Sequence, residues 1–196
     1  MTRFIFEVAL AGALTAQAAD KIKTTKGDLE VHPVRHGTVV FKWNGKIVFV
    51  DPVGGAASFK LYGTPDLVLV TDIHGDHFNK DTLTEIVKDK TVVITPEAVA
   101  ALAPEGLKKS ITTLANGGSV EKLDVKIDAV PMYNLTPARQ RFHNKGRGNG
   151  YVMTFGGKRV YVSGDTEDIP EMRSLKKIDA AFVCMNLPYT MTPEQA

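Results

Sequence analysis

The sequence predicts an α+β fold in which two β-sheets pack together and helices cover their outer faces. Apolar runs of strand length outnumber helical stretches in both halves of the chain. Two turn signals, Asn44-Gly45 and Gly156-Gly157, each join two such runs into a hairpin. The 196 residues, 43% of them hydrophobic and 23% charged, suffice for one globular domain, and no repeat or low-complexity linker divides it.

The expected elements follow one another without a long break. Apolar or alternating runs predict strands at residues 29–34, 38–43, 46–50, 68–70, 91–94, 111–114, 120–123, 125–132, 151–155, 158–162 and 178–184. Helical patterns predict helices at residues 80–89, 96–103 and 167–175. Residues 53–62, which contain Gly54 and Gly55, are expected to form a loop.

The first residues have the pattern of an export signal. One Arg precedes a mostly apolar stretch, and Ala16-Gln17-Ala18 suits a signal-peptidase site. We therefore expect residues 1–18 to be removed, residues 19–196 to form the domain, and the protein to be periplasmic or secreted. An amphipathic N-terminal helix is the alternative, and the stretch is too interrupted for a membrane span. A net charge of +2 gives no reason to expect nucleic acid, and one cysteine excludes an intrachain disulfide.

A cluster of histidines and aspartates follows the apolar run at residues 68–70. It contains Asp72, His74, Asp76 and His77, with Gly75 allowing a tight turn between them. Imidazole nitrogens and carboxylate oxygens just past a rigid strand are the ligands that a divalent transition metal requires. The alternative is a polar turn in which Asp76 caps the following helix.

These residues resemble a known metal-binding loop. Thr71-Asp72-Ile73-His74-Gly75-Asp76-His77 is similar to the loop of metallo-β-lactamase-fold hydrolases, which usually have a histidine where this chain has Asp72. Ser163-Gly164-Asp165-Thr166 resembles the second acidic motif of that family, and the likeness covers about residues 31–196. Residues 130–134 and 142–146 also resemble a subgroup related to ascorbate-phosphate lactonases. The resemblance implies a four-layer αββα sandwich of two mixed β-sheets flanked by helices.

The resemblance also implies a set of metal ligands. Asp165 would bridge two metals, although it could instead cap the helix expected after it. The family places a further histidine upstream of Asp165, and either His143 or Asn134 fits that interval, with imidazole the better zinc ligand. Our hypothesis assigns His74 and His143 to one ion, with Asp72 as a substitute ligand, and Asp76 and His77 to the other. The expected cofactor is Zn²⁺, with two ions bound and Mn²⁺ or iron as alternatives.

The expected activity is hydrolysis of a small-molecule lactone, other ester, amide or phosphoester by a metal-bound hydroxide. Asp76 is the candidate general base. Asp51 would orient a metal-ligating histidine or serve as an N-cap or turn carboxylate, and His36 would approach the centre or lie in a turn. Three further residues are weaker candidates for contacting an anionic substrate: Lys145, Arg147 and Tyr189.

The alternative function is a non-catalytic or degenerate metal-binding scaffold. Asp72 favours it, as does the end of the chain at Ala196, before the family's last metal histidine; on this reading the C-terminal part of the domain is missing. The oligomeric state is left open.

Overall fold

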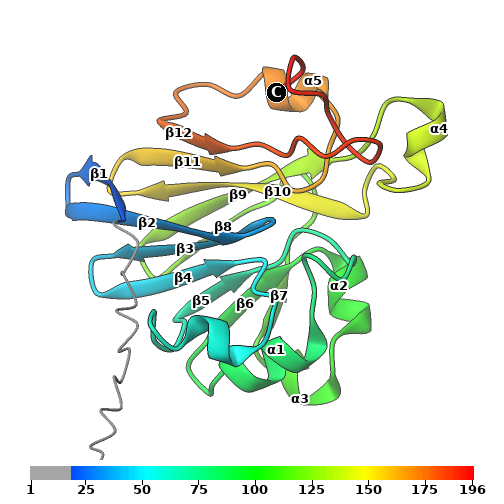
Figure 1. Cartoon of the computed structure of the whole chain (residues 1–196). Helices are drawn as coiled ribbons and strands as arrows, with labels where there is room; N and C mark the ends of the chain where they lie inside the picture. The colour runs from blue at the N-terminus through cyan, green and yellow to red at the C-terminus, as the bar shows by residue number, and fades with distance from the viewer. Residues whose placement is uncertain (1–18) are drawn as a thin grey trace, which may run out of the picture.

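The computed structural model describes residues 19–196, and it is an α+β sandwich of two mixed β-sheets (Figure 1). The first sheet contains, in spatial order, β1 (Asp20–Thr24), β2 (Gly27–Arg35), β3 (Thr38–Trp43), β4 (Lys46–Val50), β5 (Leu67–Leu69), β6 (Val92–Thr95) and β7 (Ile111–Thr113). The second contains β12 (Ala180–Phe182), β11 (Lys158–Val162), β10 (Gly148–Phe155), β9 (Val125–Met132) and β8 (Ser119–Lys122). The prediction of two mixed sheets is confirmed.

The two predicted hairpins set the register of their strands. Asn44 and Gly45 both have positive φ, 48° and 69°, and join β3 to β4 with Trp43 opposite Lys46. Gly156 and Gly157, with φ of 50° and 86°, join β10 to β11 in the same way. Two consecutive residues of positive φ match the right-handed twist of the flanking strands. Parallel pairing begins at β5, which follows β4 through a crossover, and also joins β12 to β11.

Helices complete the layers on both sides of the sandwich. The 3-10 helix η1 (Ala56–Phe59) and helices α1 (Lys80–Ile86), α2 (Glu97–Leu102) and α3 (Glu105–Lys108) lie on the side of the first sheet (Figure 1). Phe59, Leu83 and Val99 from these helices pack on its outer face. Beyond the second sheet lies α5 (Pro170–Arg173), from which Met172 packs on Val152 and Tyr161. The short helix α4 (Pro137–Gln140) projects at one end.

The main core lies between the inner faces of the two sheets. Phe41 from the first sheet and Phe155 from the second have ring centroids 5.7 Å apart, and the Trp43 ring meets Phe155 edge to face at the same distance. Each of these side chains is almost completely buried. Burying one such ring contributes about 1.5–3 kcal/mol to stability. These aromatic contacts therefore help to hold the two sheets together.

Two helices are shorter than predicted, and one strand was not predicted. Helix α1 ends at Ile86 because Val87 is extended, whereas the apolar stripe predicted a helix to residue 89. The helix predicted at 167–175 shrinks to α5, because Glu167 instead holds a neighbouring loop with its side chain. Strand β1 was missed; it is an exposed edge strand whose two lysines pair with Glu30 and Asp28.

The expected export signal at residues 1–18 lies outside the described residues. Within residues 19–196, none of the helices has the length and apolar character needed to cross a lipid bilayer.

Candidate metal centre

The loop between β5 and α1 presents the predicted histidines and aspartates at the end of the first sheet. His77 N and Phe78 N both donate to the His74 carbonyl, at 2.9 and 2.8 Å, which turns the chain back on itself. Asn79, whose side chain accepts from Thr82 N at 2.8 Å, caps the helix. The alternative in which Asp76 is the cap is therefore wrong, and the Asp76 carboxylate is free to face the site.

Asp51 holds His77 in one orientation. Asp51 Oδ2 lies 2.7 Å from His77 Nδ1, and the carboxylate also accepts from Thr71 N at 2.7 Å and Thr71 Oγ1 at 2.6 Å. Asp51 is fully buried and has a φ of 47°, a left-handed conformation that aspartate tolerates better than most residues. Because Asp51 accepts the Nδ1 proton, Nε2 is the nitrogen of His77 that can ligate a metal, which would take the place of the proton that Nε2 carries when the ring is charged. The predicted orienting role of Asp51 agrees with this geometry.

Burial and the neighbouring carboxylates shift the pKa of His77 in opposite directions. Burial would lower the pKa of His77, but the negative charges of Asp51 and Asp165 outweigh it and hold that pKa well above its ordinary value. Burial would likewise raise the pKa of Asp165, but the adjacent imidazoles of His143 and His77 lower it overall. The Asp165 carboxylate is therefore ionised over the ordinary pH range.

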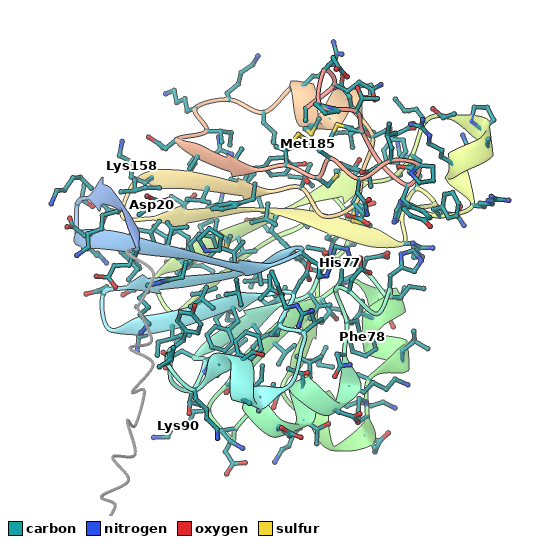
Figure 2. All side chains as sticks on the ribbon, in the orientation of Figure 1. Asp20, His77, Phe78, Lys90, Lys158 and Met185 are labelled. Atoms are coloured by element: carbon teal, nitrogen blue, oxygen red, sulfur yellow. The ribbon has the colours of Figure 1, made fainter. Side chains whose placement is uncertain are left out.

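Asp165 approaches His77 from the second sheet. It follows β11 after Gly164, whose φ is 60° and whose position leaves no room for a side chain: a Cβ there would lie 2.5 Å from the Met132 sulfur. Asn149 N donates to the Thr71 carbonyl at 2.9 Å, and Tyr151 Oη donates to the Val70 carbonyl at 2.9 Å. These bonds tie β10 to the segment after β5, so the two acidic motifs meet where the sheets end. Figure 2 shows His77 at this junction.

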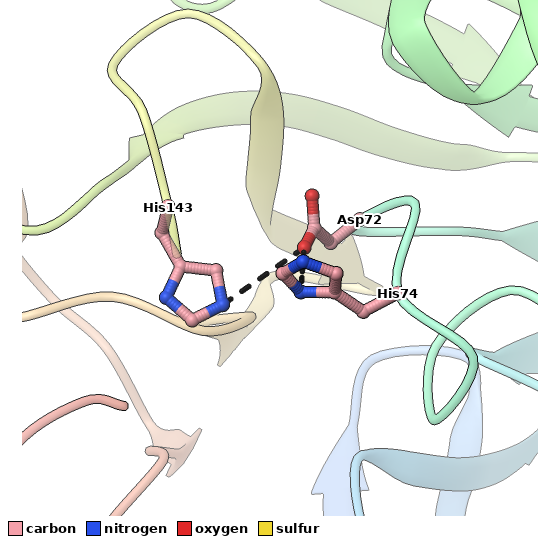
Figure 3. A group of neighbouring side chains, drawn as sticks. All are labelled: Asp72, His74 and His143. Atoms are coloured by element: carbon pink, nitrogen blue, oxygen red, sulfur yellow. Dashed lines mark ion pairs between the residues drawn. The ribbon is translucent and has the colours of Figure 1, made fainter. Parts of the chain in front are cut away.

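All six predicted metal ligands come together there in two groups. The first, here called the Asp76 group, consists of Asp76, His77 and Asp165; the second, the Asp72 group, consists of Asp72, His74 and His143 (Figure 3). Within each group the candidate ligand atoms lie within 4.8 Å of one another. Asp165 Oδ2 lies 3.4 Å from both His77 Nε2 and His143 Nε2, which places it between the two groups.

His143 is positioned by a loop that the sequence did not predict to be ordered. His143 O accepts from Asn134 N at 2.9 Å, and Asn134 Nδ2 donates to the carbonyls of Arg139 and Tyr189 at 3.0 and 2.7 Å. Asn134 thereby fixes the loop, while His143 presents Nε2 to Asp165. Of the two residues that the sequence left open, the geometry favours His143 as the ligand.

Glu167 anchors the same loop. Its carboxylate accepts from Leu135 N at 2.7 Å, Thr136 N at 2.6 Å and Arg139 Nη1 at 2.9 Å. Burial would raise the pKa of Glu167, but the hydrogen bonds led by that from Thr136 lower it overall. Sequence reasoning gave Glu167 no such role; a lone acidic residue just beyond the second acidic motif was the only signal.

The donor set fits a divalent cation. His143 is 1% exposed, and its Nε2 is buried without a hydrogen-bond partner among the described residues. Four ligands held tetrahedrally at about 2.1 Å from a zinc ion lie about 3.4 Å apart, the separation seen from Asp165 Oδ2 to the two imidazole nitrogens. A cation bound between this nitrogen and the Asp165 carboxylate would provide the partner that the buried imidazole nitrogen lacks.

Arg147 is the main residue of this region whose role the sequence did not reveal. Its Nε donates to Asp72 Oδ1 at 3.0 Å and its Nη2 to Asp72 Oδ2 at 2.9 Å, so the guanidinium holds both carboxylate oxygens. Burial would raise the pKa of Asp72, but hydrogen bonds from His74 and Arg147 lower it overall. The available signal was Asp72 itself, because a buried carboxylate in place of a neutral imidazole needs a compensating cation.

A cavity of about 970 Å³ opens beside the Asp76 group. Asp76, His77 and Asp165 line it together with residues 33–39 of the β2–β3 hairpin and residues 181–186, which run from β12 into the segment after it. His36 lies on this wall and has a φ of 45°. Lys145 pairs with Glu171 and Arg147 pairs with Asp72. These ion pairs do not support the prediction that Lys145 and Arg147 contact an anionic substrate.

The chain is similar in sequence to proteins described as metal-dependent hydrolases. A UPF0173 metal-dependent hydrolase of Geobacillus sp. (strain WCH70) is 30% identical over 174 residues, covering 82% of this chain and 75% of that protein. A UPF0173 metal-dependent hydrolase of Thermus thermophilus is 29% identical, covering 86% and 76%.

Two solved structures of proteins described as metal-dependent or metallo hydrolases are similar to this chain. The crystal structure of a protein from Parabacteroides distasonis, provisionally described as a metal-dependent hydrolase, superposes with a TM-score of 0.82 at 37% identity, covering 90% of this chain and 79% of that one. A metallo hydrolase from Ignicoccus hospitalis, at 20% identity and a TM-score of 0.66, shares the fold. The narrower likeness to ascorbate-phosphate lactonases stays a prediction. Residues 30–196 match the beta-lactamase superfamily domain, and the chain belongs to that family.

Proposed function

We propose that this chain is a metal-dependent hydrolase that cleaves a lactone, another ester, an amide or a phosphoester of a small molecule. The observation that carries the proposal is the convergence of six histidine and aspartate side chains, from segments far apart in sequence, at the end of the two sheets. Three of them line a cavity whose volume suits a small molecule. Relatives described as metal-dependent hydrolases support the same reaction class.

The proposed cofactor is Zn²⁺, with Mn²⁺ or iron as alternatives and one place for an ion in each group. Mixed imidazole and carboxylate donors suit zinc, and each carboxylate shifts the preference toward harder ions. A divalent cation held there lowers the pKa of bound water and polarises a carbonyl or phosphoryl oxygen.

The chain's own residues would provide orientation and proton transfer. Asp51 keeps the proton of His77 on Nδ1 and leaves Nε2 available. Asp76 is the candidate general base, because its side chain is 45% exposed on the cavity wall and is near enough to His77 Nε2, at 3.8 Å, to share the same centre. Arg35 and His36 at the cavity wall are available to contact an anionic part of the substrate.

Metal analysis combined with a substrate panel tests the proposal. Purified protein should contain a divalent metal and hydrolyse at least one compound among chromogenic esters, lactones and phosphodiesters. Asp165→Ala should lose both properties, whereas Asp66→Asn, which changes a carboxylate that accepts from Ile47 N away from the site, should retain both. Metal content without hydrolysis of any compound would favour the second candidate, a non-catalytic metal-binding scaffold, for which the replacement of an imidazole by Asp72 is the specific support.

We also propose, from the pattern of residues 1–18, that the protein is exported to the periplasm or secreted. N-terminal sequencing of protein recovered from cell fractions should find Ala19 as the first residue in the exported fraction. Retention of Met1 in a protein confined to the cytoplasm would contradict it.

A further inference from the structure

The two ligand groups are unequal because an arginine pairs with the carboxylate of only one of them. Arg147 holds both oxygens of Asp72, whose side chain is fully buried. His74 Nδ1 lies 2.8 Å from Asp72 Oδ2 (Figure 3). Together with Arg147 Nη2, that oxygen already has two nitrogen neighbours. A carboxylate oxygen has two lone pairs. A cation can therefore bind Asp72 Oδ2, the oxygen that faces His74, only by displacing or rearranging one of these contacts, while Oδ1 is held by Arg147 Nε.

The net charge of the two groups also differs. The Asp76 group has two carboxylates, and among residues 19–196 no lysine or arginine forms an ion pair with either of them. In the Asp72 group the guanidinium balances the charge of the single carboxylate, so this group adds no net negative charge of its own to that of Asp165, which lies between the groups. A divalent cation is attracted to the first group and gains much less at the second.

The guanidinium is held firmly in its place. Besides the two bonds to Asp72, Arg147 Nη2 donates to the Phe142 carbonyl, and the Arg147 side chain is 17% exposed. A bidentate arginine–carboxylate pair with a further backbone acceptor is among the more specific polar contacts in proteins. Arg147 is therefore not free to move away when a cation approaches Asp72.

We propose that Arg147 keeps the Asp72 group a weak metal site, so that the chain retains one divalent cation, in the Asp76 group, with the guanidinium as a fixed positive charge beside it. This inference rests on the proposed function only in assuming that the chain binds a divalent metal. It departs from the expectation of two equally held ions. The second positive charge of a two-metal centre is here contributed by a side chain.

Titration of metal-free protein with Zn²⁺ in competition with a chromogenic chelator tests the inference. The unaltered chain should bind one ion tightly and a second at least tenfold more weakly, and should keep one equivalent after dialysis. Arg147→Met, which frees the Asp72 carboxylate, should tighten the second site at least tenfold and leave the first unchanged. Lys145→Met is the matched control: it removes a nearby cation that pairs with Glu171, not Asp72, and should change neither site.

A second variant separates the two groups. Asp72→Asn should still hold the first ion at full strength, because Asp72 does not ligate it. Two equally tight ions in the unaltered chain, or an unchanged second site in a folded Arg147→Met protein, would overturn this inference alone. The absence of any tight ion in the unaltered chain would overturn the proposed function and this inference together. The measurement on the unaltered chain decides the matter even if Arg147→Met does not fold.

Discussion

Replacing Asp51 by asparagine tests how the site orients His77. Asp51 presents Oδ1 to Thr71 N and Oδ2 to both Thr71 Oγ1 and His77 Nδ1, so both of its positions accept hydrogen bonds. An asparagine amide has one oxygen and one NH₂ group. If its oxygen keeps Thr71 N, the NH₂ group faces His77 Nδ1. The imidazole proton then moves to Nε2, the nitrogen that the Asp76 group needs as a ligand.

The expected loss follows from the role of such outer partners. Removing a carboxylate that orients a metal-ligating histidine typically lowers metal affinity by about 10- to 100-fold, or about 1.4–2.7 kcal/mol. Replacing the charged acceptor and rearranging the buried hydrogen bonds of Thr71 and His77 would cost a further ~1–3 kcal/mol of folding stability. Asp51→Asn should therefore release Zn²⁺ more readily in the chelator competition and unfold at a lower temperature.

The matched control is Asp66→Asn. Asp66 Oδ2 accepts from Ile47 N at 2.9 Å and contacts none of the six candidate ligands. This variant should lose at most some stability and keep full metal affinity. Equal metal affinity in Asp51→Asn and the unaltered chain would refute the reasoning that Asp51 selects the tautomer of His77.

Three further outcomes are expected. His77→Ala and Asp165→Ala should each lose the tightly bound zinc, and full occupancy in either, measured by elemental analysis of folded protein, would contradict the assignment. Glu167→Gln should lower the free energy of unfolding by about 1–3 kcal/mol at neutral pH. Because folding lowers the pKa of Glu167, this difference is present above about pH 4.5 and should vanish as the pH falls through the folded pKa, as denaturant titrations at several pH values would show. Gly164→Ala should unfold at a lower temperature than Gly157→Ala, since both have positive φ but only the first brings a Cβ against Met132; equal melting temperatures would remove the packing argument.

Much of the fold could be predicted because local signals agreed with tertiary structure. The Asn44-Gly45 and Gly156-Gly157 turns fix register through backbone conformation alone, which the sequence states directly. Strand β1 could not be predicted in this way. Among its residues only Ile22 is apolar, so the strand has no apolar pattern to detect. Strand β1 is stabilised instead by pairing with β2, in a hairpin whose turn ends at Gly27 with a φ of 99°.

The candidate site could be predicted as a set of residues but not as a set of contacts. His74, Asp76 and His77 share one loop, so their spacing indicates a common role. The approach of Asp165 and His143 depends on β10 and β11 meeting the segment after β5, and the packing of two sheets determines that meeting. The resemblance to a family supplied this long-range information, which periodicity does not contain.

Arg147 shows why a substituted ligand has to be interpreted together with its neighbours. Asp72 alone, compared with an imidazole, predicts a more negative site with a stronger attraction for hard cations. Asp72 with Arg147 predicts the opposite, because the pair has no net charge and both carboxylate oxygens already accept a hydrogen bond from the guanidinium. The two residues are 75 positions apart in sequence, so only the folded chain shows that they belong to one unit. The replacement of the family's histidine therefore does not remove positive charge from the centre: it exchanges a place for a second cation for a guanidinium that the chain itself provides.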